Sequence, residues 1–150
     1  MKKFAEQLNF ILVETFWTIL KVEEKTLKNS SKINLTINEM HLIEAIAKNN
    51  NKGRTISDLA DDMGITLPSV TIAVNKLVKK GYVNKIKAES DGRVVLATLT
   101  KQGLKMDSIH RYFHENMVRS VEKEFTAEEK ELLIKAMDKL NSFFKRKLNA

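Results

Sequence analysis

The sequence predicts a mainly α-helical domain that carries one small β-hairpin. A single proline and five glycines in 150 residues leave little room for long irregular loops, so helices should dominate. Several long segments repeat apolar residues at three- and four-residue steps, as helices with one buried face do. Residues 82–98 instead alternate apolar and polar side chains on both sides of Asp91-Gly92, which is a strong signal for a hairpin.

Capping residues predict where the elements begin and end. A capping box is expected at Thr36 and Glu39, and Gly64 and Gly81 should each stop a helix. The expected helices span residues 4–27, 36–48, 58–63 (capped by Ser57), 67–80 (capped by Thr66), 101–121 (capped by Thr100) and a last segment opened by Thr126. A very short strand is expected at residues 54–56, and the hairpin strands at 82–87 and 94–98.

Composition and charge restrict the classes of function. The chain has no cysteine, which excludes disulfides and thiol chemistry and suits a reducing cytoplasm, where we expect the protein. A formal net charge of +7 favours a polyanionic partner such as nucleic acid, although simple lysine enrichment is the alternative explanation. We expect no membrane span, no signal peptide and no enzyme, because the apolar stretches are too short and no catalytic motif occurs.

Residues 56–98 place a short helix, a tight turn, a second helix and a hairpin in the order of a winged helix-turn-helix. On a helical wheel the second helix buries Val70, Ala73, Val74 and Leu77 and turns its opposite face to solvent. The expected DNA-contacting residues are Thr66, Pro68, Ser69, Thr71, Ile72, Asn75, Lys76 and Lys79 on this helix and Lys85, Lys87, Asp91 and Arg93 on the wing.

The chemistry of these residues suits duplex DNA. Lysines and hydroxyls bind phosphates, and Asn75 can read an adenine edge. Ile72 suits a thymine methyl and so predicts A·T-rich sites, unless it is a scattered surface residue. Arg93 at the hairpin tip fits the narrow minor groove, with Asp91 orienting its guanidinium, whereas an ordinary solvated hairpin is the alternative.

The chain resembles the MarR family of bacterial regulators, most closely its FabT branch of fatty-acid synthesis repressors. The matching segments are VEEKTLK (22–28), NEMHLIEAI (38–46), SVTIAVNKLVKKGYV (69–83), RVVLATLTKQG (93–103) and HRYFHENMV (110–118). The resemblance implies one domain, with residues 1–35 and 100–150 forming N- and C-terminal dimerisation helices and residues 36–99 the winged lobe. It also implies a homodimeric repressor on a pseudo-palindromic operator, with an acyl chain on acyl carrier protein as corepressor. Gly92 stands where the family wing usually carries a second basic residue.

The three histidines raise an alternative effector. His110 and His114 lie one helical turn apart, and together with His41 and Glu24 they form a set that zinc can use. Some MarR-type zinc sensors are similar in these helices. The alternative is that His110 and His114 lie at the edge of the core, hydrogen-bonded to Glu24 or to the backbone.

Two further expectations concern ligands and rival functions. No cofactor is required, but an apolar pocket is expected from Phe10, Phe16, Leu20, Met40, Ile109 and Phe113, unless these residues simply fill the core. A winged-helix module that docks proteins is the rival function. Such modules usually lack basic groove-facing residues, which this chain retains.

Overall fold

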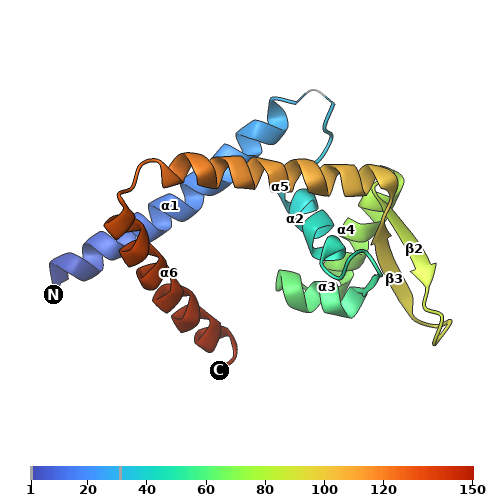
Figure 1. Cartoon of the computed structure of the whole chain (residues 1–150). Coiled ribbons are helices and arrows are strands. Elements are labelled where there is room, and N and C mark those ends of the chain that lie inside the picture. Colours follow the sequence, from blue (N-terminus) through green and yellow to red (C-terminus); the bar gives the residue numbers. More distant parts are fainter. Residues whose placement is uncertain (1, 31) are drawn as a thin grey trace. The chain divides into compact units, whose positions relative to one another are not determined.

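The computed structural model describes residues 2–30 and 32–150. It contains six helices and three strands, and Figure 1 shows them in chain order. The elements are α1 (Lys2–Lys28), α2 (Ile37–Ala47), β1 (Arg54–Thr55), α3 (Ile56–Met63), α4 (Leu67–Lys79), β2 (Val83–Lys87), β3 (Val95–Leu99), α5 (Lys101–Glu122) and α6 (Ala127–Leu148). The prediction of a mainly helical chain with one hairpin is confirmed.

The chain forms two compact units, Met1–Ser108 and Ile109–Ala150, whose boundary falls inside α5. In the first unit, α2, α3 and α4 pack with the sheet around one hydrophobic core. Its most completely buried side chains are Met40, Leu42, Ile43, Ile46, Leu59, Val70, Val74, Leu77 and Val83. This core fixes the faces that α3 and α4 turn toward solvent.

The sheet is antiparallel, with strand order β1-β3-β2. The hairpin pairs Val83 with Leu99 and Lys87 with Val95, while β1 adds a third strand by pairing Arg54 with Ala97. Val83 and Leu99 are buried at the base of the hairpin, and the rest of β2 is exposed. The hairpin is therefore anchored at its base and extends into solvent, as Figure 1 shows.

Capping explains most element boundaries. The predicted capping box at Thr36 and Glu39 is present, and so is the predicted cap at Thr126. The prediction that Ser57 caps α3 is wrong, because the cap is Thr55, whose hydroxyl accepts from the Asp58 N–H at 3.0 Å. Thr55 ends β1 in extended backbone, so Ile56 joins the helix rather than the strand.

The second unit consists of the later part of α5 and the whole of α6. None of the residues of α6 is buried. No helix within the described residues combines the length and apolarity that a bilayer crossing needs.

Gly103 lets the first turn of α5 approach the hairpin base. A Cβ atom at this position would lie 2.2 Å from the Tyr82 carbonyl oxygen and 3.2 Å from the Leu99 Cβ. The Gly103 N–H is bound by the Thr100 hydroxyl at 3.1 Å, which fixes the start of the helix at the same place. A side chain here has to push the backbone of the hairpin base away.

We therefore expect Gly103→Ala to destabilise the fold by about 1–3 kcal/mol, the usual cost of overpacking. Thermal unfolding followed by circular dichroism measures the change. Gly92→Ala is the matched control, because a Cβ at Gly92 meets nothing within 4 Å. Equal melting temperatures for Gly103→Ala and the unsubstituted chain would show that the close approach is not rigid.

Candidate nucleic-acid interface

Helix α4 is amphipathic in the way that its sequence predicts. Val70, Val74 and Leu77 are completely buried, and Ala73 packs partly buried against the same core. The helix begins after Thr66, whose hydroxyl accepts from the Ser69 N–H, and Pro68 occupies its first turn. Gly64 supplies the left-handed residue, with φ of 66°, that ends α3 and allows the tight turn between the two helices.

The opposite face of α4 is open to solvent. Ile72 is 60% exposed and Leu67 is 51% exposed, so an apolar strip runs along this face. Pro68, Ser69, Asn75, Lys76 and Lys79 are also exposed. The predicted exposure of the recognition helix is confirmed, and Leu67 joins the surface as a residue that the sequence analysis did not include.

Two of the hydroxyls expected to contact DNA are engaged within the helix. The Thr71 hydroxyl donates to the Leu67 carbonyl oxygen at 3.0 Å, and Thr71 is only half-buried rather than exposed. The Thr66 hydroxyl caps α4 and also contacts the Ser69 hydroxyl at 2.8 Å. Of the residues predicted to face a base edge, Ile72 and Asn75 are exposed and have no side-chain hydrogen bond within the helix that the structure describes, whereas the Ser69 hydroxyl accepts from Thr66.

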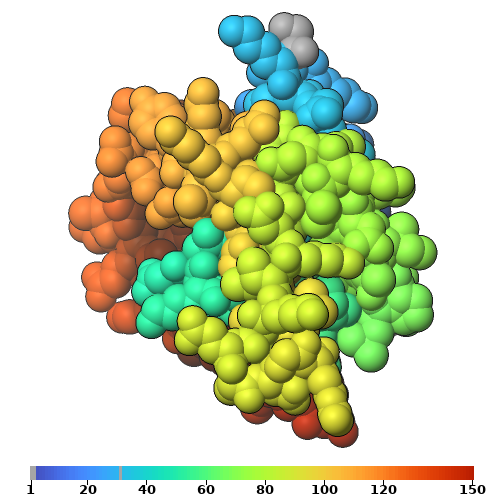
Figure 2. Space-filling view, turned by 90° about the vertical axis from the view of Figure 1, so that its right-hand side faces the viewer, coloured from blue at the N-terminus to red at the C-terminus, as the bar shows by residue number. Residues whose placement is uncertain are grey.

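The hairpin carries basic side chains away from the core. Lys85 and Lys87 alternate on β2, and Arg93 follows the turn, all three exposed. Figure 2 shows the hairpin, coloured from yellow-green to yellow, on the face that is turned to the viewer. Asp91 accepts from the Arg93 backbone N–H at 3.0 Å, so its carboxylate shapes the turn, whereas the predicted contact was with the guanidinium.

The cations on this surface differ from Lys48, Arg54 and Lys80 of the same unit. Within residues 2–30 and 32–150, no carboxylate pairs with Lys76, Lys79, Lys85, Lys87 or Arg93. Lys48 and Arg54, in contrast, both pair with Asp62, at 2.8 Å, and Lys80 pairs with Glu39 at 2.9 Å. Unpaired surface cations are the ones that release counterions when they bind phosphates.

Asp62 ties three elements together behind the helix-turn-helix. It lies on α3 and accepts from Lys48 at the end of α2 and from Arg54 in β1, while Arg54 also donates to the Ala45 carbonyl oxygen at 2.8 Å. Hydrogen bonds from Lys48, and next from Arg54, hold the pKa of Asp62 below its usual value. The position of α3 under the recognition helix is thus fixed partly by charge.

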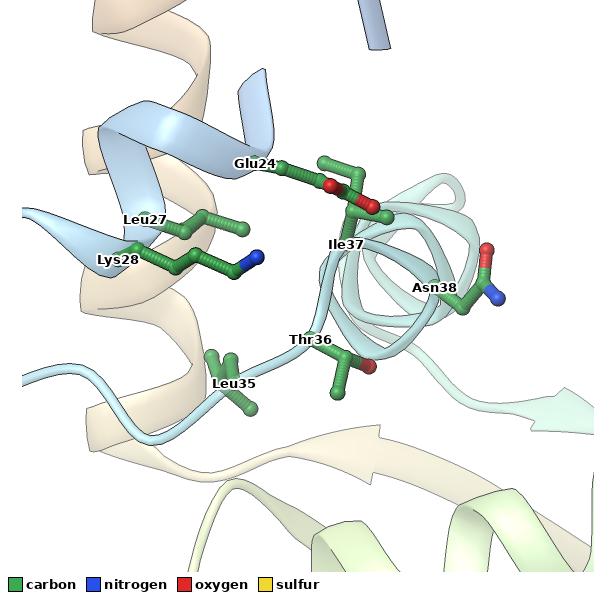
Figure 3. Close-up of a pocket in the computed structure, with 7 residues that line it drawn as sticks. All are labelled: Glu24, Leu27, Lys28, Leu35, Thr36, Ile37 and Asn38. Carbon is green, nitrogen blue, oxygen red and sulfur yellow. The ribbon is translucent and has the colours of Figure 1, made fainter. Parts of the chain in front are cut away.

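A pocket of about 250 Å³ lies between the end of α1 and the start of α2 (Figure 3). It is lined by Glu24, Leu27, Lys28, Leu35, Thr36, Ile37 and Asn38, and none of these was among the predicted pocket residues. Of the predicted set, Phe10 and Phe16 are exposed, Leu20 is half-buried and Met40 is completely buried in the core. Ile109 and Phe113 belong to the second unit.

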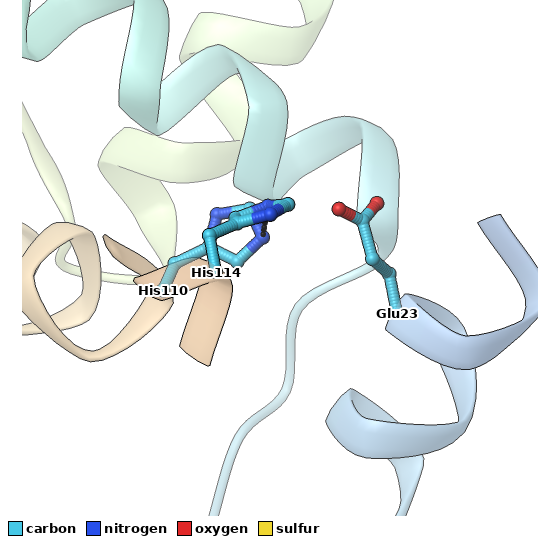
Figure 4. Close-up of side chains that lie close together, drawn as sticks. All are labelled: Glu23, His110 and His114. Atoms are coloured by element: carbon cyan, nitrogen blue, oxygen red, sulfur yellow. Dashed lines mark hydrogen bonds between the residues drawn. The ribbon is translucent and has the colours of Figure 1, made fainter. Parts of the chain in front are cut away.

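The histidines make contacts within each unit. In the first unit, His41 Nε2 lies 3.3 Å from a carboxylate oxygen of Glu23, which is buried, whereas Glu24, the carboxylate of the predicted zinc set, is exposed and lines the pocket. In the second unit, the Nε2 atoms of His110 and His114 lie 3.1 Å apart, joined by the dashed line in Figure 4. Figure 4 also draws Glu23, which comes from α1.

An exposed recognition helix beside a basic hairpin is the arrangement of a winged helix-turn-helix transcription regulator. The sequence profile of the MarR family matches residues 33–94. The structure of Streptococcus pneumoniae FabT in complex with DNA is 32% identical to this chain, covers 95% of it and 98% of its own length, and superposes with a TM-score of 0.89. The chain therefore belongs to the MarR family.

Two curated relatives are transcriptional regulators as well. The transcriptional regulator ZitR of Lactococcus lactis subsp. cremoris is 25% identical over 118 residues, which are 77% of this chain and 79% of ZitR. The HTH-type transcriptional regulator YhjH of Bacillus subtilis is 26% identical over 88 residues, which are 59% of this chain. The chain spans only about half the length of YhjH, since the match covers 49% of that protein.

The charge cluster around Asp62 makes stability depend on pH. Because folding lowers the pKa of Asp62, its stabilising effect is present above the unfolded-state pKa of about 3.9 and is lost as pH falls through the folded-state value. We expect Asp62→Asn to lower the melting temperature by roughly 2–4 °C at pH 7, and the difference to shrink below about pH 4.

Differential scanning calorimetry across this pH range measures the effect of Asp62→Asn. Asp61→Asn is the matched control, since no described residue forms an ion pair with this neighbouring, exposed carboxylate. If both variants melt alike at every pH, the charge cluster does not support α3.

Proposed function

We propose that the chain is a homodimeric repressor that inserts α4 of each copy into successive major grooves of a pseudo-palindromic operator. The observation that carries the proposal is the exposed face of α4, where Ile72, Lys76 and Lys79 stand beside the unpaired cations of the wing. The solved complex of S. pneumoniae FabT with DNA supports the same use of a similar chain.

Each part of the surface has a separate task in this proposal. Lys76, Lys79 and Lys85 bind phosphates and set the register on the duplex without reading sequence. Asn75 pairs with an adenine edge, and Ile72 packs against a thymine methyl, so the operator is rich in A·T pairs. Arg93 enters the minor groove, which is narrow and strongly negative in A·T-rich DNA.

A second copy of the chain covers the apolar surfaces that a single copy leaves open. On α1, Phe10 is 63% exposed and Trp17 is 55% exposed, and on α6, Ile134 is 70% exposed and Phe144 is 51% exposed. Apolar exposure on this scale marks an interface in a protein with no membrane-spanning helix among its described residues. A twofold axis also explains a palindromic operator, with half-sites about 34 Å apart.

We propose an acyl chain, delivered on acyl carrier protein, as the corepressor. Support comes from the pocket beside α1, where Leu27, Leu35 and Ile37 supply apolar walls and Lys28 a cation. Its volume of about 250 Å³ accommodates roughly eight groups of the size of a water molecule or a methylene. One end of an acyl chain fits such a space.

Zinc is the second candidate effector, and the His110–His114 pair favours it. The two Nε2 atoms lie 3.1 Å apart, close to the spacing of about 3.3 Å that two nitrogens at 2.0–2.1 Å from a tetrahedral zinc ion have. Both nitrogens would then supply lone pairs to the metal in place of the hydrogen bond that joins them. Glu23, rather than Glu24, is the buried carboxylate on α1.

Substitution of the DNA-facing cations tests the repressor proposal. We expect Lys76→Ala and Arg93→Ala each to weaken binding to a duplex that the unsubstituted protein selects from a random library by roughly tenfold. Each should also reduce the dependence of log K on log salt by about 0.9 per lost phosphate contact. Fluorescence anisotropy over a salt series measures both quantities, and light scattering checks that the dimer is unchanged.

Lys52→Ala is the control for these substitutions, because Lys52 is exposed in the loop before β1 and lies outside the proposed interface. If no duplex is selected, or if binding to DNA does not depend on salt, the alternative function, a winged-helix module that docks proteins, is favoured instead. A monomer in light scattering would overturn the homodimer.

A thermal-shift screen tests the two effectors together. Acyl carrier protein bearing a long acyl chain should raise the melting temperature, while the same carrier without the chain should not, because only a ligand of the native state stabilises it. Zinc should raise the melting temperature only if the His110–His114 pair binds the metal. In that case His114→Ala should remove the shift caused by zinc and leave the shift caused by acyl carrier protein unchanged. If no ligand shifts the transition, both effector proposals fall and the DNA-binding proposal stands.

A further inference from the structure

The C-terminal end of α4 is joined to the connector between α1 and α2. Lys80 is the C-cap residue of α4, and its ammonium donates to the Asn34 carbonyl oxygen at 2.6 Å and to the Glu39 carboxylate at 2.9–3.0 Å. The Tyr82 hydroxyl donates to the side-chain oxygen of Asn34 at 2.8 Å. Two side chains that follow the recognition helix thus hold one residue of the connector.

The backbone between these side chains makes the double contact possible. Gly81 adopts a left-handed conformation with φ of 85°, which reverses the chain directly after α4. Lys80 and Tyr82, on either side of this turn, therefore reach the same residue, Asn34. The Tyr82 ring is 3% exposed within the core, so the position of its hydroxyl is fixed.

Glu39 completes the cluster from α2. Its carboxylate accepts from the Thr36 N–H in the capping box at 3.3 Å and also binds Lys80. The side chains of Glu39 and Lys80 are only 11% and 30% exposed, so their contact is better shielded from water than a typical surface ion pair. Lys79, one residue earlier, is exposed and forms no ion pair with any residue that the structure describes.

We propose that Lys80 and Tyr82 are positioning residues, which set the angle of the recognition helix by pinning its end to Asn34 and do not touch DNA. The turn at Gly64 holds the start of α4. A helix that must enter a DNA groove at a defined angle also has to be held at its other end. This proposal rests on the DNA-binding function proposed above. Leu35 and Thr36, which follow Asn34 in the connector, also line the pocket beside α1. A shift of the connector at this pocket therefore moves Asn34 and, through its contact with Lys80, the end of α4.

Salt dependence separates a positioning lysine from a phosphate-binding one. On the duplex selected by the unsubstituted protein, Lys79→Met should weaken binding and reduce the salt slope by about 0.9. Lys80→Met should weaken binding by roughly tenfold, the usual effect of losing a charged hydrogen bond, with the salt slope unchanged. A reduced slope for Lys80→Met would show that Lys80 binds phosphate, and unchanged affinity would show that it positions nothing.

A double-mutant cycle tests the tie to Asn34 itself. Tyr82→Phe and Asn34→Ala each remove the same hydrogen bond, so the double variant should bind DNA no more weakly than either single variant. Additive losses would overturn the proposal. Lys80→Arg retains a donor toward Asn34 and Glu39 and should restore most of the affinity lost in Lys80→Met.

Two further readouts exclude a purely structural role. All variants are compared well below their melting temperatures, so that a loss of affinity reflects the folded protein. The loss of affinity for duplexes whose half-sites are moved apart by one base pair should be smaller for Lys80→Met than for the unsubstituted chain. The reason is that the angle of α4 is less fixed in the variant. Equal discrimination would contradict the proposal. If the unsubstituted protein selects no duplex at all, the DNA-binding function fails rather than this assignment.

Discussion

The burial of one face of α4 is the constraint on which the rest of the structure depends. Val70, Val74 and Leu77 are completely removed from water, and each such side chain contributes about 1.5–3 kcal/mol. This burial leaves no freedom in how α4 rotates about its axis, so Ile72, Asn75 and Lys76 must face outward. The same packing that stabilises the lobe therefore selects the side chains that are available to a partner.

The wing depends on the same core through its base. Val83 and Leu99 are buried and paired, and Gly103 allows α5 to lie directly against the Tyr82 carbonyl oxygen. Beyond this base β2 carries only exposed side chains, whereas β3 is held further along by the buried Ala97 and by its pairing with β1. The lobe thus combines a recognition helix that is fixed by packing with a basic hairpin whose tip, beyond Val95 and Lys87, is held only by the turn, which suits one rigid and one adaptable contact.

The sequence predicted those features that depend on local chemistry. The period of Val70, Val74 and Leu77 and the cap at Thr66 identify α4, and Asp91-Gly92 identifies the hairpin. The start of α3 was placed wrongly because Thr55 and Ser57 are equally good caps. The pairing of β1 with β3, which selects Thr55, joins residues about forty positions apart in the sequence.

The site was predicted less completely than the fold, for related reasons. The bond from Asp91 to the Arg93 N–H is an Asx turn, a local pattern that could have been recognised. Glu23 and Glu24 both interrupt the apolar stripe of α1, and each stands three or four residues from both Leu20 and Leu27, so periodicity alone could not choose between them. The pocket was missed because Leu35 and Ile37 lie beside a polar connector that looked like a simple break between helices.

Charge shows most clearly why sequence and structure give different answers. Lys79 and Lys80 are neighbours of identical chemistry, yet Lys79 faces solvent while Lys80 binds a carbonyl oxygen of the connector and a carboxylate of α2. Lys48 and Arg54 are likewise occupied by Asp62. The net charge of +7 therefore overstates the cations that can meet a phosphate on the lobe, and it also hides where they are. A partner meets only the cations that the fold leaves unpaired, and among the described residues these include the cations of α4 and the wing that form the proposed DNA surface, namely Lys76, Lys79, Lys85, Lys87 and Arg93.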